Sequence, residues 1–151
     1  MLYRHVPIAK VLGIRVVNYD GVRLVVRAPL VVNVNHYGTA FAGSIGAVLM
    51  LGGFTIIRQK LVDIGYSARI KLVKSRISYL HPVTADIEAF CELTSELSVA
   101  DIERELSRDR TLKAEVIGSI QSASQTAVRY TGLYAIRALK GDETDQNDFF
   151  C

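Results

Sequence analysis

Charged side chains are missing from an unusually long part of this 151-residue chain. The thirty residues from 28 to 57 contain no Asp, Glu, Lys or Arg, and no carboxylate occurs between Asp20 and Asp63. A catalytic carboxylate is therefore excluded from this stretch. Residues 33–44 are mostly polar or small, whereas residues 45–57 are almost wholly apolar. We expect a long buried helix whose polar first turn, with its unpaired N–H groups, is a candidate site for a polarised carbonyl.

Cysteine is also scarce. Cys91 and Cys151 provide neither a disulfide framework nor a metal-ligand spacing. Cys91 alternates with apolar neighbours in the segment IEAFCEL, which predicts a small buried hydrophobic residue. No His, Cys and acid cluster predicts a metal site, and no cofactor is expected. Nothing calls for an oxidising compartment, so we expect a cytoplasmic protein.

Acidic residues gather at the C-terminal end. Residues 140–151 hold four acids and one Lys, which leaves 17 basic and 11 acidic side chains in residues 1–139. We expect a single domain over 1–139 and an acidic, disordered tail over 140–151. The mildly basic body suits a small polyanionic ligand. Its charge is too weak and too scattered to predict a nucleic-acid partner.

The uncharged stretch is long enough to span a bilayer. Its front half is polar, however, and four glycines interrupt the rest: Gly43, Gly46, Gly52 and Gly53. Strand-like segments follow it and need partners. We therefore expect a core helix and no membrane insertion.

The remaining periodicity predicts a helix at residues 8–12 and three hairpins around the long helix. The first hairpin turns at Asp20-Gly21. The second joins residues 67–79 to residues 85–93 through His81-Pro82, with a bulge near Leu72. The third joins residues 112–121 to 127–139, after a short helix capped by Ser98. This order predicts an α+β protein in which an antiparallel sheet curls around a central helix from about Thr39 to Val62, the hotdog fold.

The segment NHYGTAFAGSIGAVLMLGG carries a family likeness. It resembles the helix-entry motif of hotdog-fold acyl-CoA thioesterases, and more closely the thioesterase family typified by the C-terminal domain of YiiD. The likeness covers nearly all of residues 1–139. It implies a homodimer or homotetramer that binds an acyl thioester of coenzyme A or of a carrier protein at the dimer seam. The thioester carbonyl would lie at the helix start, near Gly43, with coenzyme A outside against basic side chains.

The same resemblance leaves the catalytic base open, because the helix carboxylate of common thioesterases aligns with Met50. The remaining candidates for catalysis are Asn35, His36, Thr39 and Ser44. His36 is either the general base, with Asn35 orienting water, or a loop histidine, and Thr39 is either a site residue or the helix N-cap. Ser44 as a nucleophile lacks the usual motif.

Substrate contacts are expected from the residues around the helix start and from one later strand. They are Tyr37, Gly38, Phe41, Ala42, Gly43, Lys74, Arg76 and Tyr79. Lys74 and Arg76, together with Lys71, either bind the coenzyme A phosphates or form a solvated face. Tyr79 either lines the acyl channel or packs in the core.

Three functions follow from these patterns. The first is hydrolysis of an acyl thioester. The second is a non-catalytic acyl-thioester binding module, which the methionine at position 50 favours. The third is a structural oligomer, which requires the crevice at Gly43 to be closed.

Overall fold

The computed structural model describes residue 3, residues 6–106, residue 108 and residues 110–138. Its helices are α2 (Pro7–Val11), α3 (Leu30–Asn33), α4 (Ala42–Asp63) and α5 (Val99–Leu106). Its strands are β1 (Arg15–Tyr19), β2 (Arg23–Ala28), β3 (Ala68–Tyr79), β4 (Ile87–Leu93), β5 (Leu112–Ser122) and β6 (Gln125–Ala138). The expectations for the tail over 140–151 and for Cys151 fall outside these residues.

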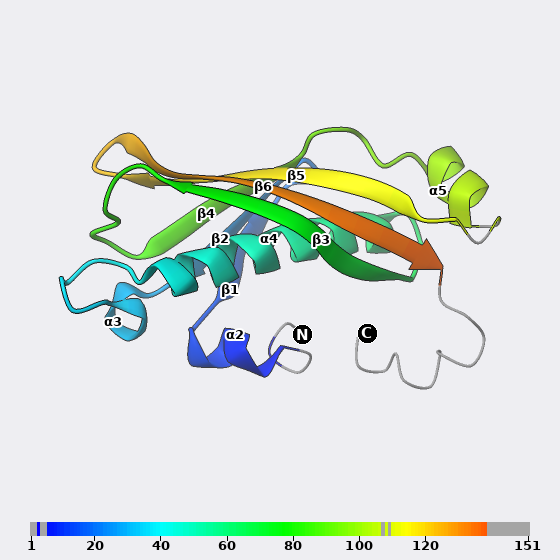
Figure 1. The fold of residues 1–151 in the computed structure, drawn as a ribbon. Coiled ribbons are helices and arrows are strands. Elements are labelled where there is room, and N and C mark those ends of the chain that lie inside the picture. Colours follow the sequence, from blue (N-terminus) through cyan, green and yellow to red (C-terminus); the bar gives the residue numbers. More distant parts are fainter. Residues whose placement is uncertain (1–2, 4–5, 107, 109, 139–151) are drawn as a thin grey trace.

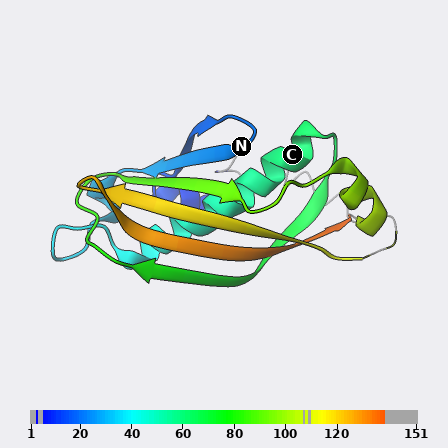
Figure 2. The ribbon, with the colours of Figure 1, turned by 90° about the horizontal axis from the view of Figure 1, so that it is seen from above.

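All six strands form one antiparallel sheet in the order β1-β2-β4-β5-β6-β3. The sheet curls over α4, which runs along its inner face (Figures 1 and 2). The apolar residues of β5 and β6 alternate as expected, with Val116, Ile120, Tyr134 and Ile136 buried on that inner face. The α+β hotdog architecture is therefore confirmed.

Two glycines bring α4 close to the sheet. A Cβ on Gly52 would lie 2.7 Å from Sγ of Cys91, and a Cβ on Gly53 would overlap the hydroxyl of Tyr134. The Tyr134 hydroxyl donates a 2.8 Å hydrogen bond to the carbonyl of Met50 and lies 2.7 Å from the hydroxyl of Tyr130. Burial raises the pKa of both tyrosines. The middle of the helix is thus fixed to the sheet by a buried polar contact that only glycine leaves room for.

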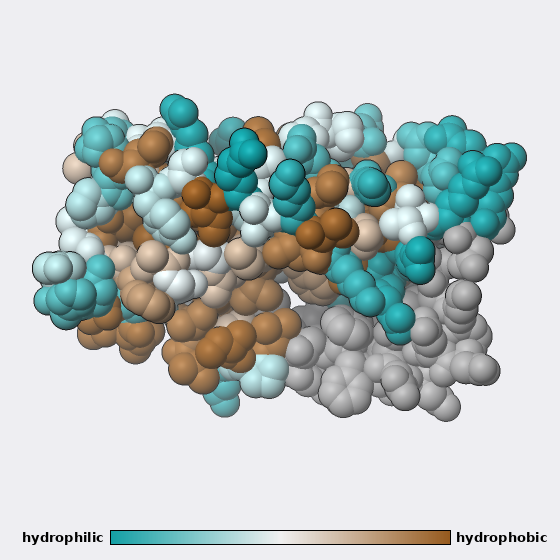
Figure 3. All heavy atoms as spheres, viewed as in Figure 1, coloured by the Kyte–Doolittle hydropathy of each residue, from teal (hydrophilic) through white to brown (hydrophobic). Residues whose placement is uncertain are grey.

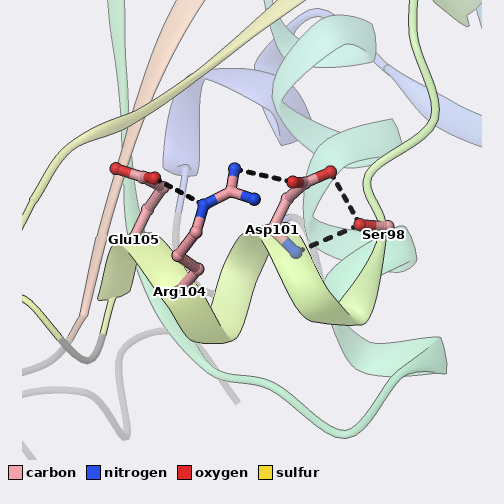
Figure 4. Close-up of polar contacts among 4 residues, drawn as sticks. All are labelled: Ser98, Asp101, Arg104 and Glu105. Carbon is pink, nitrogen blue, oxygen red and sulfur yellow. Dashed lines mark hydrogen bonds and ion pairs between the residues drawn. The ribbon is translucent and has the colours of Figure 1, made fainter.

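Two local predictions are confirmed. In β3 the register slips between Leu72 and Lys74, so a bulge reconciles the two phases of its alternation. In α5 the Ser98 hydroxyl oxygen accepts a 3.0 Å hydrogen bond from the Asp101 N–H and donates to the Asp101 carboxylate at 2.7 Å (Figure 4). Arg104 approaches the same carboxylate from the next turn. The hydrogen bond from Ser98 lowers the pKa of Asp101.

The predicted hairpin between β3 and β4 is wrong. β3 pairs with β6 at one edge of the sheet, whereas β4 lies between β2 and β5. Cross-strand charges help to explain the choice, because Arg23 and Arg27 of β2 stand directly opposite Glu92 and Glu88 of β4 and form ion pairs with them. The turn at residues 81–82 therefore sends the chain across the sheet and not back along β3.

The start of the central helix also differs from the expectation. α4 begins at Ala42, and its N-cap position is Phe41, which has no side-chain cap. Thr39 is not the N-cap, because its backbone and hydroxyl are held by Asn35 in the preceding turn. The helix therefore starts with free backbone donors.

The same helix is long and apolar enough to span a membrane, but half of its most apolar window is buried in the protein, as in a core helix.

Candidate functional site

Three backbone donors are left open at the start of α4. The first helical hydrogen bond runs from the Ile45 N–H to the Phe41 carbonyl at 3.0 Å. The N–H groups of Ala42, Gly43 and Ser44 consequently have no acceptor among the described residues. Ala42 and Gly43 are exposed, whereas Ser44 is buried. The positive end of a 22-residue helix dipole therefore opens to the surface at a position without a side chain.

Phe41 and Tyr79 frame this helix start. A Cβ on Gly43 would overlap the Phe41 ring, so the ring lies against the glycine. From β3, the Tyr79 hydroxyl donates a 3.1 Å hydrogen bond to the Ala42 carbonyl. Both aromatic side chains are about half exposed. Three of the predicted substrate contacts, Phe41, Ala42 and Tyr79, thus lie around Gly43.

The loop before α4 is a tight finger. Val34 and Ala40 form an antiparallel bridge, and the Asn35 N–H donates to the Thr39 carbonyl at 2.7 Å. The Asn35 side-chain oxygen accepts hydrogen bonds from the N–H groups of Tyr37 and Thr39, and its amide nitrogen donates to the Thr39 hydroxyl. Asn35 therefore shapes the finger, and it keeps one amide hydrogen for another partner.

His36 lies at the tip of this finger, with Tyr37 and Gly38. The ring centroids of His36 and Tyr37 are 3.8 Å apart, and both side chains are exposed. Gly38 has a positive φ of 79°, which lets the chain reverse. The finger extends beyond the start of α4 (Figure 1). Within the described part of one chain, the imidazole forms no hydrogen bond.

Asn33, at the base of the finger, was not among the predicted residues. It is buried, and its amide nitrogen donates to the carbonyls of Leu12 and Pro29 at 2.8 and 2.7 Å. Its side-chain oxygen has no hydrogen-bond partner among the described residues. From the sequence, Asn33 was recognisable only as a polar residue two positions before Asn35. Its hydrogen bond to the Leu12 carbonyl joins residues far apart in the sequence, so only the fold reveals it. Asn33 anchors the finger to the N-terminal helix.

Lys74 and Arg76 lie on the other face of the sheet. They line a surface cavity of about 290 Å³ together with Glu115, Thr131 and Leu133. Register explains the placement, since Arg76 stands opposite Thr131, whereas Tyr79 stands opposite the buried Val128. The structure therefore divides the predicted substrate contacts between the two faces of β3.

No carboxylate of the described residues accepts a hydrogen bond from the backbone N–H groups at the start of α4. Met50 packs against the core, and its carbonyl is occupied by Tyr134. Asp63 lies at the opposite end of the helix, where it accepts hydrogen bonds from Tyr19 at 2.7 Å and Gln59 at 3.1 Å that lower its pKa. The described residues also contain no group of His, Cys, Asp and Glu side chains that could hold a metal ion.

A curled antiparallel sheet on a long central helix defines a protein of the hotdog fold. The chain belongs to the family described as "Putative thioesterase (yiiD_Cterm)", whose model matches residues 1–138. The chain is similar to a Shewanella oneidensis protein whose structure carries the description "putative thioesterase", with 25% identity, a TM-score of 0.80, and coverage of 89% of this chain and 90% of that one.

Two further structures show the same fold. A Chlorobaculum tepidum protein of unknown function is 23% identical, with a TM-score of 0.84 and coverage of 91% of this chain and 90% of that chain. A Haemophilus influenzae thioesterase is 11% identical, with a TM-score of 0.69 and coverage of 85% and 81%.

Proposed function

We propose that this protein hydrolyses acyl thioesters of coenzyme A or of a carrier protein at the start of α4. The observation that carries the proposal is the set of free N–H groups at Ala42, Gly43 and Ser44. Thioester hydrolysis passes through a tetrahedral oxyanion, and fixed backbone donors stabilise such a charge without reorganising. The half-exposed rings of Phe41 and Tyr79 supply apolar contact for the acyl chain beside the carbonyl.

A second copy of the chain completes the site in this proposal. β3 is a 12-residue strand at the edge of the sheet, with its outer backbone edge unpaired in the described chain and with Leu72 and Val73 exposed. Such an edge invites pairing with another strand. A dimer joined there, or a tetramer of two such dimers, would allow a finger of one protomer to approach the helix start of its partner.

In this arrangement His36 is the general base. Histidine is the side chain most often used as a general base, and the step required here is proton abstraction from water. The free amide hydrogen of Asn35 and the hydroxyls of Thr39 and Ser44 are the remaining polar groups that orient water or substrate. Lys74 and Arg76 bind the phosphates of coenzyme A or of the carrier protein's phosphopantetheine arm. The protein would work in the cytoplasm, where its buried free thiol at Cys91 stays reduced.

The alternative is a module that binds acyl thioesters without turnover. The specific observation in its favour is Met50, which occupies the helix position of the usual carboxylate and has its carbonyl bound to Tyr134. Residues 21–62 contain no acid that could replace it.

The test follows thiol release from acyl-CoAs ranging from acetyl to palmitoyl. We expect His36→Ala to lower kcat by about a hundredfold or more, the usual contribution of a general base. His81→Ala is the matched control, because His81 is also an exposed loop histidine and lies outside the site. Turnover that survives His36→Ala would remove the base assignment. Tight acyl-CoA binding without turnover in the unmodified protein would establish the binding module instead.

Mixing two variants of low activity tests whether the site is shared between protomers. A His36→Ala chain keeps Gly43, and a Gly43→Ala chain keeps His36. If the two residues act across the seam, an equal mixture regains about a quarter of the unmodified activity, because half of the dimers are hybrids with one intact site of two. If both residues act within one chain, mixing restores nothing.

A further inference from the structure

The outer face of β5, β6 and β3 is strongly basic. Seven basic side chains point outward from these three strands, and the only acid there is Glu115. The bases are Arg69, Lys71, Lys74, Arg76, Lys113, Arg129 and Arg137. Figure 3 shows hydrophilic side chains, interspersed with hydrophobic ones, along the upper, sheet side of the view. We call this face of three strands the basic face.

The strand register gathers these charges. Lys71 and Lys113 both flank Ala135 of β6, one from each side. One step along β6, Lys74 and Glu115 flank Leu133 in the same way. Bases on three separate segments of the sequence thus become neighbours only when β6 lies between β3 and β5.

Five of the seven bases of this face have side chains without a partner among the described residues. The side chains of Lys71, Lys74, Arg76, Lys113 and Arg129 form no ion pair or hydrogen bond there, whereas Arg137 donates to the Thr111 hydroxyl at 2.6 Å. On the other half of the same outer face, the arginines of β2 are each paired with a glutamate of β4. Neighbouring like charges in a sheet destabilise the folded state, so such a face points to an external negative partner.

The size of the basic face discriminates between partners. From Arg129 to Arg137 it extends over nine residues of β6, whose eight steps span about 26 Å along the strand. The 290 Å³ cavity beside Lys74 and Arg76 has room for one phosphate-bearing group. The rest of the face lies beyond the reach of a single nucleotide. Its outward positions hold no aromatic side chain, so it offers no stacking platform for single-stranded nucleic acid.

We infer that the basic face docks an acidic carrier protein, which presents its acyl group as a thioester on a phosphopantetheine arm. This inference rests on the proposed hydrolase function and names its substrate class. The arm's phosphate would enter the cavity at Arg76. Three residues further along β3, Tyr79 reaches the start of α4 on the inner face, so the end of this strand connects the docking face to the site. The arm would pass around that end.

The test compares one acyl group attached to coenzyme A with the same acyl group attached to a carrier protein. The substrates are palmitoyl-CoA and palmitoyl phosphopantetheine on an acidic acyl carrier protein. The variant is Lys113→Glu with Arg129→Glu, which reverses two charges of the basic face at positions that do not line the cavity. The control is Lys10→Glu with Arg15→Glu, which makes the same charge change at exposed positions on α2 and β1. Binding of fluorescently labelled carrier protein is measured separately by anisotropy.

We expect the basic-face variant to lower kcat/KM for the carrier substrate by about tenfold or more while changing that for palmitoyl-CoA by less than about twofold. The effect should shrink between about 50 mM and about 300 mM NaCl, whereas the control should leave both substrates unchanged. Equal loss on both substrates, or loss on neither, would overturn the inference. So would tighter binding to anionic vesicles or to single-stranded RNA than to the carrier protein.

The anisotropy measurement separates this inference from the proposed function. Carrier binding that depends on Lys113 and Arg129, in a protein that hydrolyses neither substrate, would sustain the docking face and refute the hydrolase. Hydrolysis of palmitoyl-CoA without carrier binding would do the reverse.

Discussion

Replacing Gly53 by alanine should destabilise this protein, although alanine is the better helix former. Gly53 lies in the middle of α4, directly beneath the hydroxyl of Tyr134. A methyl group there would overlap that oxygen and lie 2.8 Å from Cζ of the ring. Tyr134 is almost fully buried, so its ring has no open space into which to retreat.

The magnitude follows from three opposing contributions. Overpacking a rigid core site costs about 2 kcal/mol. The shift would break the hydrogen bond from Tyr134 to the Met50 carbonyl, at about 1 kcal/mol. The helix propensity of alanine returns about 1 kcal/mol. We therefore expect the free energy of unfolding to fall by about 2 kcal/mol.

Urea denaturation followed by circular dichroism measures this loss, and Gly46→Ala is its control. Gly46 is buried in the same helix, but a Cβ there would lie 3.4 Å from Cδ1 of Ile77, which is ordinary contact. The control should therefore gain up to about 1 kcal/mol from helix propensity. A Gly53→Ala protein as stable as the Gly46→Ala protein would refute the close approach of helix and sheet.

A double-mutant cycle identifies the atom responsible. Tyr134→Phe alone should cost about 1 to 3 kcal/mol, because it leaves the buried Met50 carbonyl and Tyr130 hydroxyl without their partner. It also removes the oxygen that the Gly53→Ala methyl group would overlap. The double variant should thus be more stable than the sum of the single losses, by about 1 kcal/mol. Strict additivity would show that the hydroxyl is not the obstacle.

Three other predictions concern separate regions. Gly43→Ala should lower thioester kcat/KM by about tenfold or more yet leave urea stability within about 0.5 kcal/mol, because the half-exposed ring of Phe41 can move aside. Ser98→Ala should cost about 1 kcal/mol at neutral pH. The depressed pKa of Asp101 stabilises the fold above its usual value of 3.8, so the loss measured by denaturation should be smaller at about pH 3. Burial raises the pKa of the Cys91 thiol to about 12, so peptide mapping should find Cys91 alkylated by iodoacetamide only after unfolding.

Local patterns were enough to predict most elements of the fold. The hairpin at Asp20-Gly21, the bulge in β3 and the cap at Ser98 each depend on residues close together in the sequence, and all three are present. The position of β4 depends instead on pairing with β2, about sixty residues earlier. The turn residues at 81–82 predict that the chain changes direction, but they do not predict which strands pair with each other in the sheet.

The candidate site was predictable to a similar depth. The motif contains Gly43 and Phe41, because a helix start and its flanking residues are continuous in sequence, whereas Tyr79 reaches the helix start from β3. The role of Asn35 in shaping the finger was not visible, since an amide that orients water and one that closes a turn have the same composition. The basic face was only half visible. Lys71, Lys74 and Arg76 share one strand, but Lys113 and Arg129 join them only through the register of β6.

The bulge in β3 also determines which changes of length this strand tolerates. Val73 is the extra residue, since Leu72 and Lys74 oppose consecutive residues of β6. Deleting Val73 would give a regular strand with every other side chain on its present face. Inserting one residue between Lys74 and Tyr79 would instead turn the following residues over and move the Tyr79 hydroxyl away from the helix. Members of the family can therefore differ by one residue at this position and still align on both sides of it.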